Sequence, residues 1–300
     1  MGQAVFQNQP VYELRDGESQ VFVAPQYGAR LLQWTIGSQP IIHWPENSDW
    51  TSAETVAKTR GGNPILFPFL GRHFVDGNRE FWRDEKGVVR DMPMHGFARD
   101  LPFEVVEIGD TQIRMRLETT KQTRELYPFD FRFDVVYRLT GNILETTFET
   151  SSTGKASLPY YAGHHFYFSI PHQERANWQI ELPCRTWGRQ NPDGSPQLYP
   201  AENTTTTLAN PDIIDRFHLD FEQSVVTLTN TTNQRQIAVS WDQVQNDLWY
   251  DVTTWTSTPE SDFYCVEPWL GLPDAIHHKQ GLRILASGQT EFATCRITAS

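Results

Sequence analysis

Apolar and polar residues alternate with a period of two along much of this chain. Such alternation is typical of β-strands that bury one face, because successive side chains of a strand point to opposite sides. The alternating segments are residues 20–25, 111–119, 131–140, 143–152, 224–230, 235–241 and 291–299. Turn-forming sequences, Thr-Gly-Asn at 140–142 and Asn-Thr-Thr-Asn-Gln at 230–234, separate two pairs of these segments and predict two β-hairpins.

Helical periodicity is nearly absent. Its best candidate, residues 49–59, predicts a helix of one or two turns with Ser52 or Thr51 as the N-cap. Strands that follow one another without intervening helices argue against βαβ units and favour an all-β sandwich or barrel. Because no internal repeat or low-complexity linker interrupts the pattern, residues 1–300 are expected to form one all-β domain.

Charge and composition narrow the class of protein. The chain has 300 residues and a formal net charge of −12, so it repels nucleic acids and anionic membranes, and neither is expected as a partner. The first residues lack a basic and apolar leader, and no run of about 18 apolar residues occurs, so a cytoplasmic protein without a membrane span is expected. Three widely separated cysteines fit neither a disulfide framework nor a zinc motif.

Two adjacent histidines lie in "GHHFYFSI", residues 163–170, which we interpret as one strand. Alternation then places His165 with Tyr167 and Ser169 on a polar, aromatic face suited to a cleft wall. The opposite, apolar face comprises His164, Phe166, Phe168 and Ile170. His165 is therefore the functional candidate, although a hydrogen-bonded structural histidine remains the alternative. No metal site is predicted, because adjacent histidines on a strand cannot easily share an ion and neither H-x-H nor H-E-x-x-H occurs.

A carboxylate in apolar surroundings follows in "YCVEPWLGLPD", residues 264–274. Pro268 favours an extended residue before it and suits a strand end, so Glu267 is expected where a strand stops. Its apolar neighbours should raise the pKa of the carboxyl, which suits a general base. A glutamate paired with an arginine is the alternative. Arg72, which follows the apolar run within residues 61–74, offers donors for hydroxyls or carboxylates, with a surface arginine as its alternative.

Taken in order, these stretches resemble the aldose 1-epimerase (galactose mutarotase-like) family, in particular its bacterial branch. The resemblance rests on "PILFP" followed by Gly71-Arg72, on "MPMHGFAR" at 92–99 and on "EPWLGLPD" at 267–274. "YPFDF" at 127–131, "GHHFYF" at 163–168 and "SGQTEFATCRI" at 287–297 fit the same pattern. The resemblance implies a large antiparallel β-sandwich that interconverts the α and β anomers of an aldose without a metal or organic cofactor.

The resemblance also implies roles for individual residues. Glu267 matches the general base, His165 the general acid, and His95 a partner near the ring oxygen or a neighbouring hydroxyl. Arg72 matches a hydroxyl ligand. A substrate-holding aspartate falls on Asp215, with Asp212 in reserve, and Trp269 is an aromatic suited to the apolar face of a sugar.

Two departures from the family pattern concern the strand and the sugar. Phe166 stands where proline usually follows the histidine, and "GRHFVDG" lacks the asparagine-arginine pair found after the glycine-arginine in many galactose mutarotases.

Several alternatives remain open from the sequence. A non-catalytic carbohydrate-binding sandwich would not need His165 and Glu267 to face each other. A glycosidase would use Glu267 and Asp215 as its two carboxylates. A metal-dependent sugar isomerase and a hexose-6-phosphate mutarotase are further candidates, and the arginines that might reach a phosphate are Arg79, Arg83, Arg90 and Arg99. We predict that free hexose is preferred, and the sequence leaves open whether the protein is a monomer or a homodimer.

Overall fold

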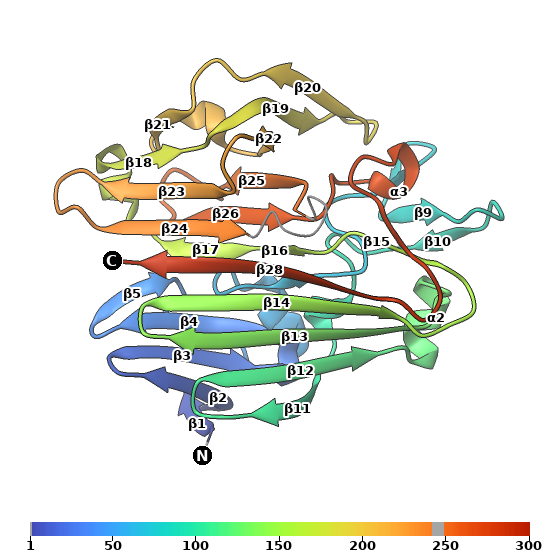
Figure 1. Cartoon of the computed structure of the whole chain (residues 1–300), viewed down its shortest axis with the longest axis horizontal. Coiled ribbons are helices and arrows are strands. Elements are labelled where there is room, and N and C mark those ends of the chain that lie inside the picture. The colour runs from blue at the N-terminus through green and yellow to red at the C-terminus, as the bar shows by residue number, and fades with distance from the viewer. Residues whose placement is uncertain (1, 242–248) are drawn as a thin grey trace.

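Two large antiparallel β-sheets make up most of the protein in a computed structural model, which describes residues 2–241 and 249–300 (Figure 1). The larger sheet has thirteen strands within the described residues. Eleven of them follow the order β1 (Gln3–Phe6), β2 (Gln9–Asp16), β3 (Ser19–Ala24), β4 (Arg30–Ile36), β5 (Gln39–Ile42), β17 (Phe166–Ser169), β26 (Phe263–Trp269), β25 (Asp251–Trp255), β22 (Arg216–Phe221), β19 (Cys184–Gln190) and β20 (Pro196–Pro200). The short strands β16 (Gly163–His164) and β6 (Ile65–Leu66) join it beside β26.

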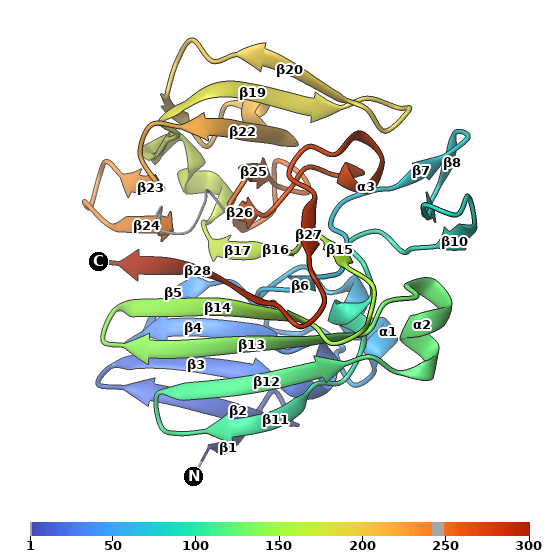
Figure 2. The same ribbon diagram turned by 45° about the vertical axis from the view of Figure 1, so that its right-hand side comes forward.

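The smaller sheet has nine strands in the same described ranges. Their order is β11 (Glu104–Ile108), β12 (Gln112–Glu118), β13 (Phe131–Thr140), β14 (Ile143–Ser152), β28 (Thr290–Ala299), β24 (Gln236–Trp241), β23 (Val225–Asn230), β18 (Trp178–Glu181) and β21 (Thr205–Thr207). The turned view shows β12, β13 and β14 lying in front of β3 and β4, so the two sheets form layers (Figure 2). The predicted antiparallel all-β sandwich is thereby confirmed.

Short elements complete the fold. Three two-stranded ribbons pair β7 (Phe74–Val75) with β8 (Asn78–Arg79), β9 (Phe81–Arg83) with β10 (Val89–Asp91), and β15 (Leu158–Tyr160) with β27 (Arg283–Leu285). The helices are α1 (Ala53–Lys58), α2 (Lys121–Leu126) and α3 (Ala275–His278), and the 3-10 turns are η1 (Pro25–Tyr27), η2 (Ala98–Asp100), η3 (His172–Asn177) and η4 (Pro211–Ile213). No helix among the described residues is long and apolar enough to cross a membrane.

All seven alternating segments lie on strands, and both predicted hairpins form. In one hairpin β13 pairs with β14, from Phe131 opposite Ser152 to Thr140 opposite Ile143. In the other hairpin β23 pairs with β24. The predicted helix is α1, with Ser52 as its N-cap in a capping box with Thr55. The sequence analysis missed α2, which begins at a similar box formed by Thr120 and Thr123.

Two local predictions were wrong. Residues 163–170 are not one continuous strand, because the ladder breaks between β16 and β17 at His165. Glu267 does not lie at a strand end, because β26 continues through Pro268 to Trp269. Pro268 has no N–H to give to the neighbouring strand, so a break in the adjacent ladder is a natural consequence of its position.

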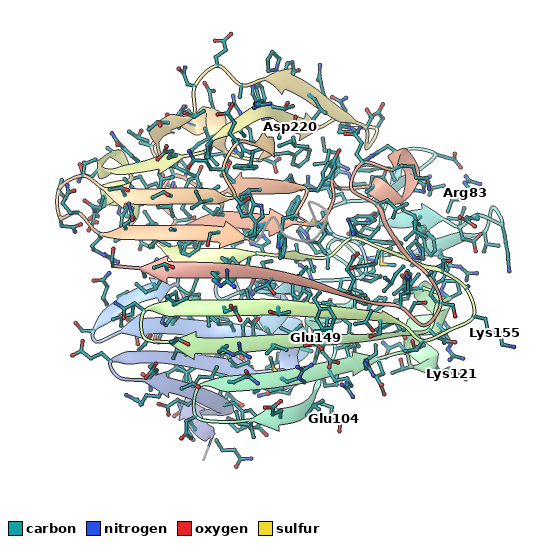
Figure 3. All side chains as sticks on the ribbon, viewed as in Figure 1. Arg83, Glu104, Lys121, Glu149, Lys155 and Asp220 are labelled. Carbon is teal, nitrogen blue, oxygen red and sulfur yellow. The ribbon has the colours of Figure 1, made fainter. Side chains whose placement is uncertain are left out.

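The core lies between the two sheets and is rich in rings. Phe67 stacks on Phe133 of the smaller sheet with ring centroids 4.1 Å apart, and each fully buried ring of this kind contributes about 1.5–3 kcal/mol. Charged side chains such as Glu104, Lys121 and Lys155 lie at the periphery, away from the interior (Figure 3). The inner faces of the two sheets are therefore filled by packed side chains. A catalytic or binding site is expected on an outer face or at a sheet edge.

Candidate active site

A row of side chains crosses the outer face of the larger sheet. Phe217 of β22 pairs with Thr253 of β25, and Thr253 pairs with Glu267 of β26. On the other side of β26, Phe166 pairs with Val266 and Gly163 with Trp269, and this register carried through the break places His165 opposite Glu267. Directly opposed residues on antiparallel strands have their side chains on the same face, so strand register alone brings the histidine to the carboxylate.

His165 and His164 point to opposite sides of the sheet, as predicted. The His164 ring stacks on Phe148 of the smaller sheet at 4.1 Å, and its Nδ1 lies 3.0 Å from Asn63 Nδ2. The backbone N–H of His165 donates to Asn63 Oδ1 at 2.9 Å instead of to the ladder. Asn63 thus holds the break in the strand, with His164 in the core and His165 turned outward.

The His165 and Glu267 side chains form a buried pair. His165 Nδ1 and Glu267 Oε1 are 3.5 Å apart, and neither His165 Nδ1 nor Glu267 Oε2 has a hydrogen-bond partner in the described part of the chain. Burial, followed by the Asp215 and Asp251 carboxylates, raises the pKa of Glu267 well above its usual value. Burial, followed by the charge of Arg99, lowers the pKa of His165 to about 3. Burial thus favours the proton on the Glu267 carboxyl group over the His165 imidazole.

His95 approaches the same place from a loop. Its backbone N–H donates to the Gly71 carbonyl at 2.9 Å, and its ring Nδ1 accepts from the Gly71 N–H at 3.1 Å. Burial lowers the pKa of His95 well below its usual value, so the ring is neutral and the remaining Nε2 carries its proton as a donor. Because His95 has φ 70°, a conformation unusual for a side chain of this size, these two bonds to Gly71 fix a backbone that costs about 1–3 kcal/mol.

Gly71 is required where it stands. It has φ 74°, and a Cβ atom there would lie 2.4 Å from Pro273 Cβ. The glycine lets the loop that ends in Arg72 pass close to the segment after β26, so that both reach one site.

A cavity of about 490 Å³ opens over this row. It is lined by all six residues singled out from the sequence: Arg72, His95, His165, Asp215, Glu267 and Trp269. Asp212, the reserve, lies in η4 outside this lining, where its carbonyl accepts from Arg189. The volume falls in the usual range for small-molecule sites, about 300–1,000 Å³.

Positive side chains are more numerous at the cavity than predicted. Arg30, Lys58, Arg60 and Arg99 line it together with Arg72. Arg60 lies over the Trp255 ring at 5.2 Å, and Arg99 is 3.8 Å from Asp100. Of the four arginines considered for a phosphate, only Arg99 reaches the cavity. The others lie elsewhere: Arg79 over Phe74, Arg83 with Asp76 and Arg90 with Asp84.

Other lining residues were missed from the sequence. Thr253 and Trp255 belong to β25, which the sequence analysis did not recognise, although "DVTTW" carries the β-branched residues typical of strands. Tyr167, placed correctly on the face of His165, stacks on that ring at 4.7 Å. Arg60 follows a short helix and gives no sequence signal.

Three potential metal ligands meet beneath the cavity. One ligand atom from each of His165, Cys265 and Glu267 lies within 4.8 Å of the others, and all three residues are buried. Sequence spacing could not reveal this group, because His165 is a hundred residues from the strand that carries the other two. The sequence analysis predicted no metal site and did not anticipate this group of ligands.

Fold and cavity together define an antiparallel β-sandwich whose candidate functional groups lie on the outer face of the larger sheet. Residues 10–298 match the profile of the aldose 1-epimerase family, and the chain belongs to that family.

Two known proteins are similar to this chain over most of their length, and a third is similar over a shorter stretch. The chain is 24% identical to protein LacX of Lactococcus lactis subsp. lactis over 233 residues, which is 72% of this chain and 76% of that protein. A "galactose mutarotase related enzyme" from Lactobacillus acidophilus has a similar structure, with a TM-score of 0.78, 22% identity and 97% of each chain covered. A Salmonella typhimurium protein named "Putative glucose-6-phosphate 1-epimerase" is 29% identical over 108 residues, or 35% of this chain and 31% of that protein.

Proposed function

We propose that this protein is an aldose 1-epimerase that interconverts the α and β anomers of a hexose. The observation that carries the proposal is the His165–Glu267 pair, a buried imidazole and a buried carboxyl group 3.5 Å apart at the wall of a cavity. Opening a sugar ring removes a proton from the C1 hydroxyl and delivers one to the ring oxygen. A pair that accepts and donates a proton in the same event meets this requirement.

The number of protons on the pair is the same at the start and at the end of a catalytic cycle. The reaction starts once the proton of the pair has moved from the Glu267 carboxyl group to His165. Glu267 as carboxylate then accepts the C1 hydroxyl proton while His165 as imidazolium donates to the ring oxygen, and the C1–O5 bond breaks to leave an aldehyde. The proton then lies on Glu267 and His165 is neutral, which is the state that burial favours in the empty site. After rotation about C1–C2, the reverse transfers close the ring on the other face. The carboxyl and imidazole exchange roles with direction, so both anomers are substrates.

The remaining cavity residues suit the binding of a sugar. His95 presents a neutral N–H donor, which fits the ring oxygen or an adjacent hydroxyl. Arg72 and Asp215 supply a donor and an acceptor for further hydroxyls. Trp269 is held by its Nε1–H, which donates to the His164 carbonyl at 3.1 Å, and its ring can lie against the apolar face of a pyranose.

Polarimetry tests this function directly. We expect the protein to accelerate the change in optical rotation of fresh α-D-glucose or α-D-galactose well above the spontaneous rate in the same buffer. A non-catalytic sugar-binding protein would bind these sugars without accelerating the change. Release of nitrophenol from nitrophenyl glycosides would instead indicate a glycosidase and overturn the proposal.

A phosphorylated hexose is a second candidate substrate. Five cationic side chains line the cavity of a chain whose net charge is −12, and the Salmonella relative bears the name of a glucose-6-phosphate 1-epimerase. We keep the prediction that free hexose is preferred. The same assay, run with glucose and glucose 6-phosphate at equal concentration, decides between them. A much faster reaction of the phosphate would make the sugar phosphate the substrate.

Asp215 should hold the substrate and Asp212 should not. Asparagine tolerates the positive φ of 58° at residue 215, so Asp215→Asn keeps the backbone while removing a charged acceptor. We expect kcat/KM to fall about tenfold or more, on the scale of a lost hydrogen bond to a charged group. Asp212→Asn is the matched control, with near wild-type kinetics expected. Equal kinetics of the two variants would remove Asp215 from the proposed site.

A further inference from the structure

We propose that His165, Cys265 and Glu267 form a zinc site on the floor of the cavity, and that Zn²⁺ bound there blocks the sugar site. Cys265 and Glu267 are two residues apart on β26 and face the same side, and Cys265 is opposite Tyr167 on β17, two residues from His165. One nitrogen, one sulfur and one oxygen ligand atom thus lie within 4.8 Å of one another.

The donor set matches the coordination that zinc prefers. Bonds of about 2.0–2.3 Å to nitrogen, oxygen and sulfur in a tetrahedron place the ligand atoms about 3.3–3.8 Å apart. His165 Nδ1 and Glu267 Oε1 are already 3.5 Å apart. A shift of the Cys265 thiol by about 1 Å brings the third ligand atom within this spacing. A small rotation about χ1 of Cys265 supplies such a shift.

Two buried polar atoms without hydrogen-bond partners also favour a bound ligand. Glu267 is 1% exposed, and its Oε2 and the buried His165 Nδ1 have no hydrogen-bond partner among residues 2–241 and 249–300. Buried polar atoms without partners are rare in folded proteins, and a bound ligand or ion is one way to satisfy them. A sugar hydroxyl can serve this purpose from the cavity side, whereas an ion can serve both atoms and the thiol at once.

Charge and access favour the ion as well. Zinc binding releases the Cys265 thiol proton and the proton shared by His165 and Glu267 to solvent. The resulting thiolate and carboxylate neutralise the two charges of Zn²⁺. His165 and Glu267 line the cavity, which leaves the fourth coordination position for water. With Zn²⁺ in place, neither group can transfer a proton to or from a sugar.

The two parts of this proposal depend differently on the proposed function. Zinc binding follows from the ligand atoms alone, and inhibition rests on the proposed roles of His165 and Glu267. Binding is therefore measured without a sugar, and inhibition by polarimetry in a separate experiment.

Titration calorimetry with ZnCl₂, after chelator treatment under reducing conditions, tests the binding. We expect one Zn²⁺ per chain for wild type and for Cys295→Ser, a matched control that alters another fully buried cysteine, on β28. Cys265→Ser should bind at least about tenfold more weakly, since even outer-shell changes weaken metal binding about 10–100-fold. Wild-type affinity in a folded Cys265→Ser protein would overturn the site, as would no binding to wild type.

Cobalt supplies a test that needs no change at Cys265. Cys184 lies 3.8 Å from His218 and is the competing thiol, so the double variant Cys184→Ser/Cys295→Ser leaves Cys265 as the sole cysteine. CoCl₂ should give this variant a thiolate-to-cobalt charge-transfer band in the near ultraviolet. Absence of the band would overturn Cys265 as a ligand.

Activity then decides what the metal does. We expect the chelator-treated protein to be fully active, and ZnCl₂ to inhibit it in competition with sugar, with the inhibition weakened about tenfold or more in Cys265→Ser relative to Cys295→Ser. Zinc that binds without inhibiting would overturn the blocking role. Activity lost on chelation and restored by Zn²⁺ would overturn both the blocking role and the metal-free acid–base mechanism.

Discussion

Glu267→Gln should lower the turnover of hexose anomerisation by at least about a hundredfold, the scale of a lost general base. Glutamine keeps the shape of the side chain and can still meet a hydroxyl, but it cannot accept the C1 hydroxyl proton. Because the change removes proton transfer and little binding, kcat should fall much more than KM rises. Polarimetry at several concentrations of α-D-glucose separates the two constants.

The pH dependence supplies an independent signature of the pair. Wild-type activity requires one proton on His165 and Glu267 together, so it should decline at high pH as that proton leaves. The raised pKa of the buried Glu267 carboxyl places this decline well above the usual range of a glutamate. The residual activity of Glu267→Gln should lack this decline. A folded variant that anomerises glucose and galactose at near wild-type speed would contradict the assignment and make Asp215 the first suspect.

The same variant should gain stability at neutral pH. Folding raises the pKa of Glu267, so its contribution to stability is present below its usual value near 4.5 and is lost as the pH rises through the folded-state pKa. Glutamine has no proton to lose. The variant should therefore melt at a higher temperature than wild type near pH 7, with the difference shrinking towards pH 4. Such melting curves also prove that the inactive variant is folded.

His165→Asn should also abolish most of the turnover, whereas His164→Asn should leave it largely intact. His165 faces the cavity and carries the proton for the ring oxygen, and the loss of a positioned acid corresponds to about a hundred- to ten-thousandfold. His164 faces the core, stacked between Phe148 and Phe166 at 4.1 and 4.8 Å. Its replacement by a smaller polar group should destabilise the fold by about 1–3 kcal/mol.

Urea denaturation and polarimetry on both variants distinguish these effects. The two substitutions are chemically identical and one residue apart, so each is the control for the other. Comparable losses of activity in two folded variants would show that the direction of the side chains does not decide function, and the assignment of His165 as the acid would fail.

Much of the fold was predictable because strand alternation is a local property. In β13 and β14 a ten-residue pattern set both the strands and their hairpin, and the same alternation separated His165 from His164. The break between β16 and β17 was not predictable, because it depends on Pro268, which lies opposite His164 in a strand a hundred residues away. Local propensity contains no information about a partner strand.

The candidate site was also predictable only in part. Its six predicted residues came from motif resemblance together with local chemistry, and the structure brings all six to one cavity. Thr253 joins the site only through the pairing of β25 with β26, Cys265 meets His165 only through the pairing of β17 with β26, and Arg60 reaches the cavity only through the path of a loop. Very short strands such as β6 and β7 have no pattern of their own, since two residues cannot show a period.

The position of β28 determines when the protein can fold during synthesis. This strand, residues Thr290–Ala299, pairs with β14 on one side and with β24 on the other, so it joins the two halves of the smaller sheet. Until those residues have left the ribosome, β14 and β24 each present an unpaired edge to the solvent. We therefore expect the nascent chain to need protection from association until nearly all of it has been translated, and a truncation before residue 290 to yield aggregates.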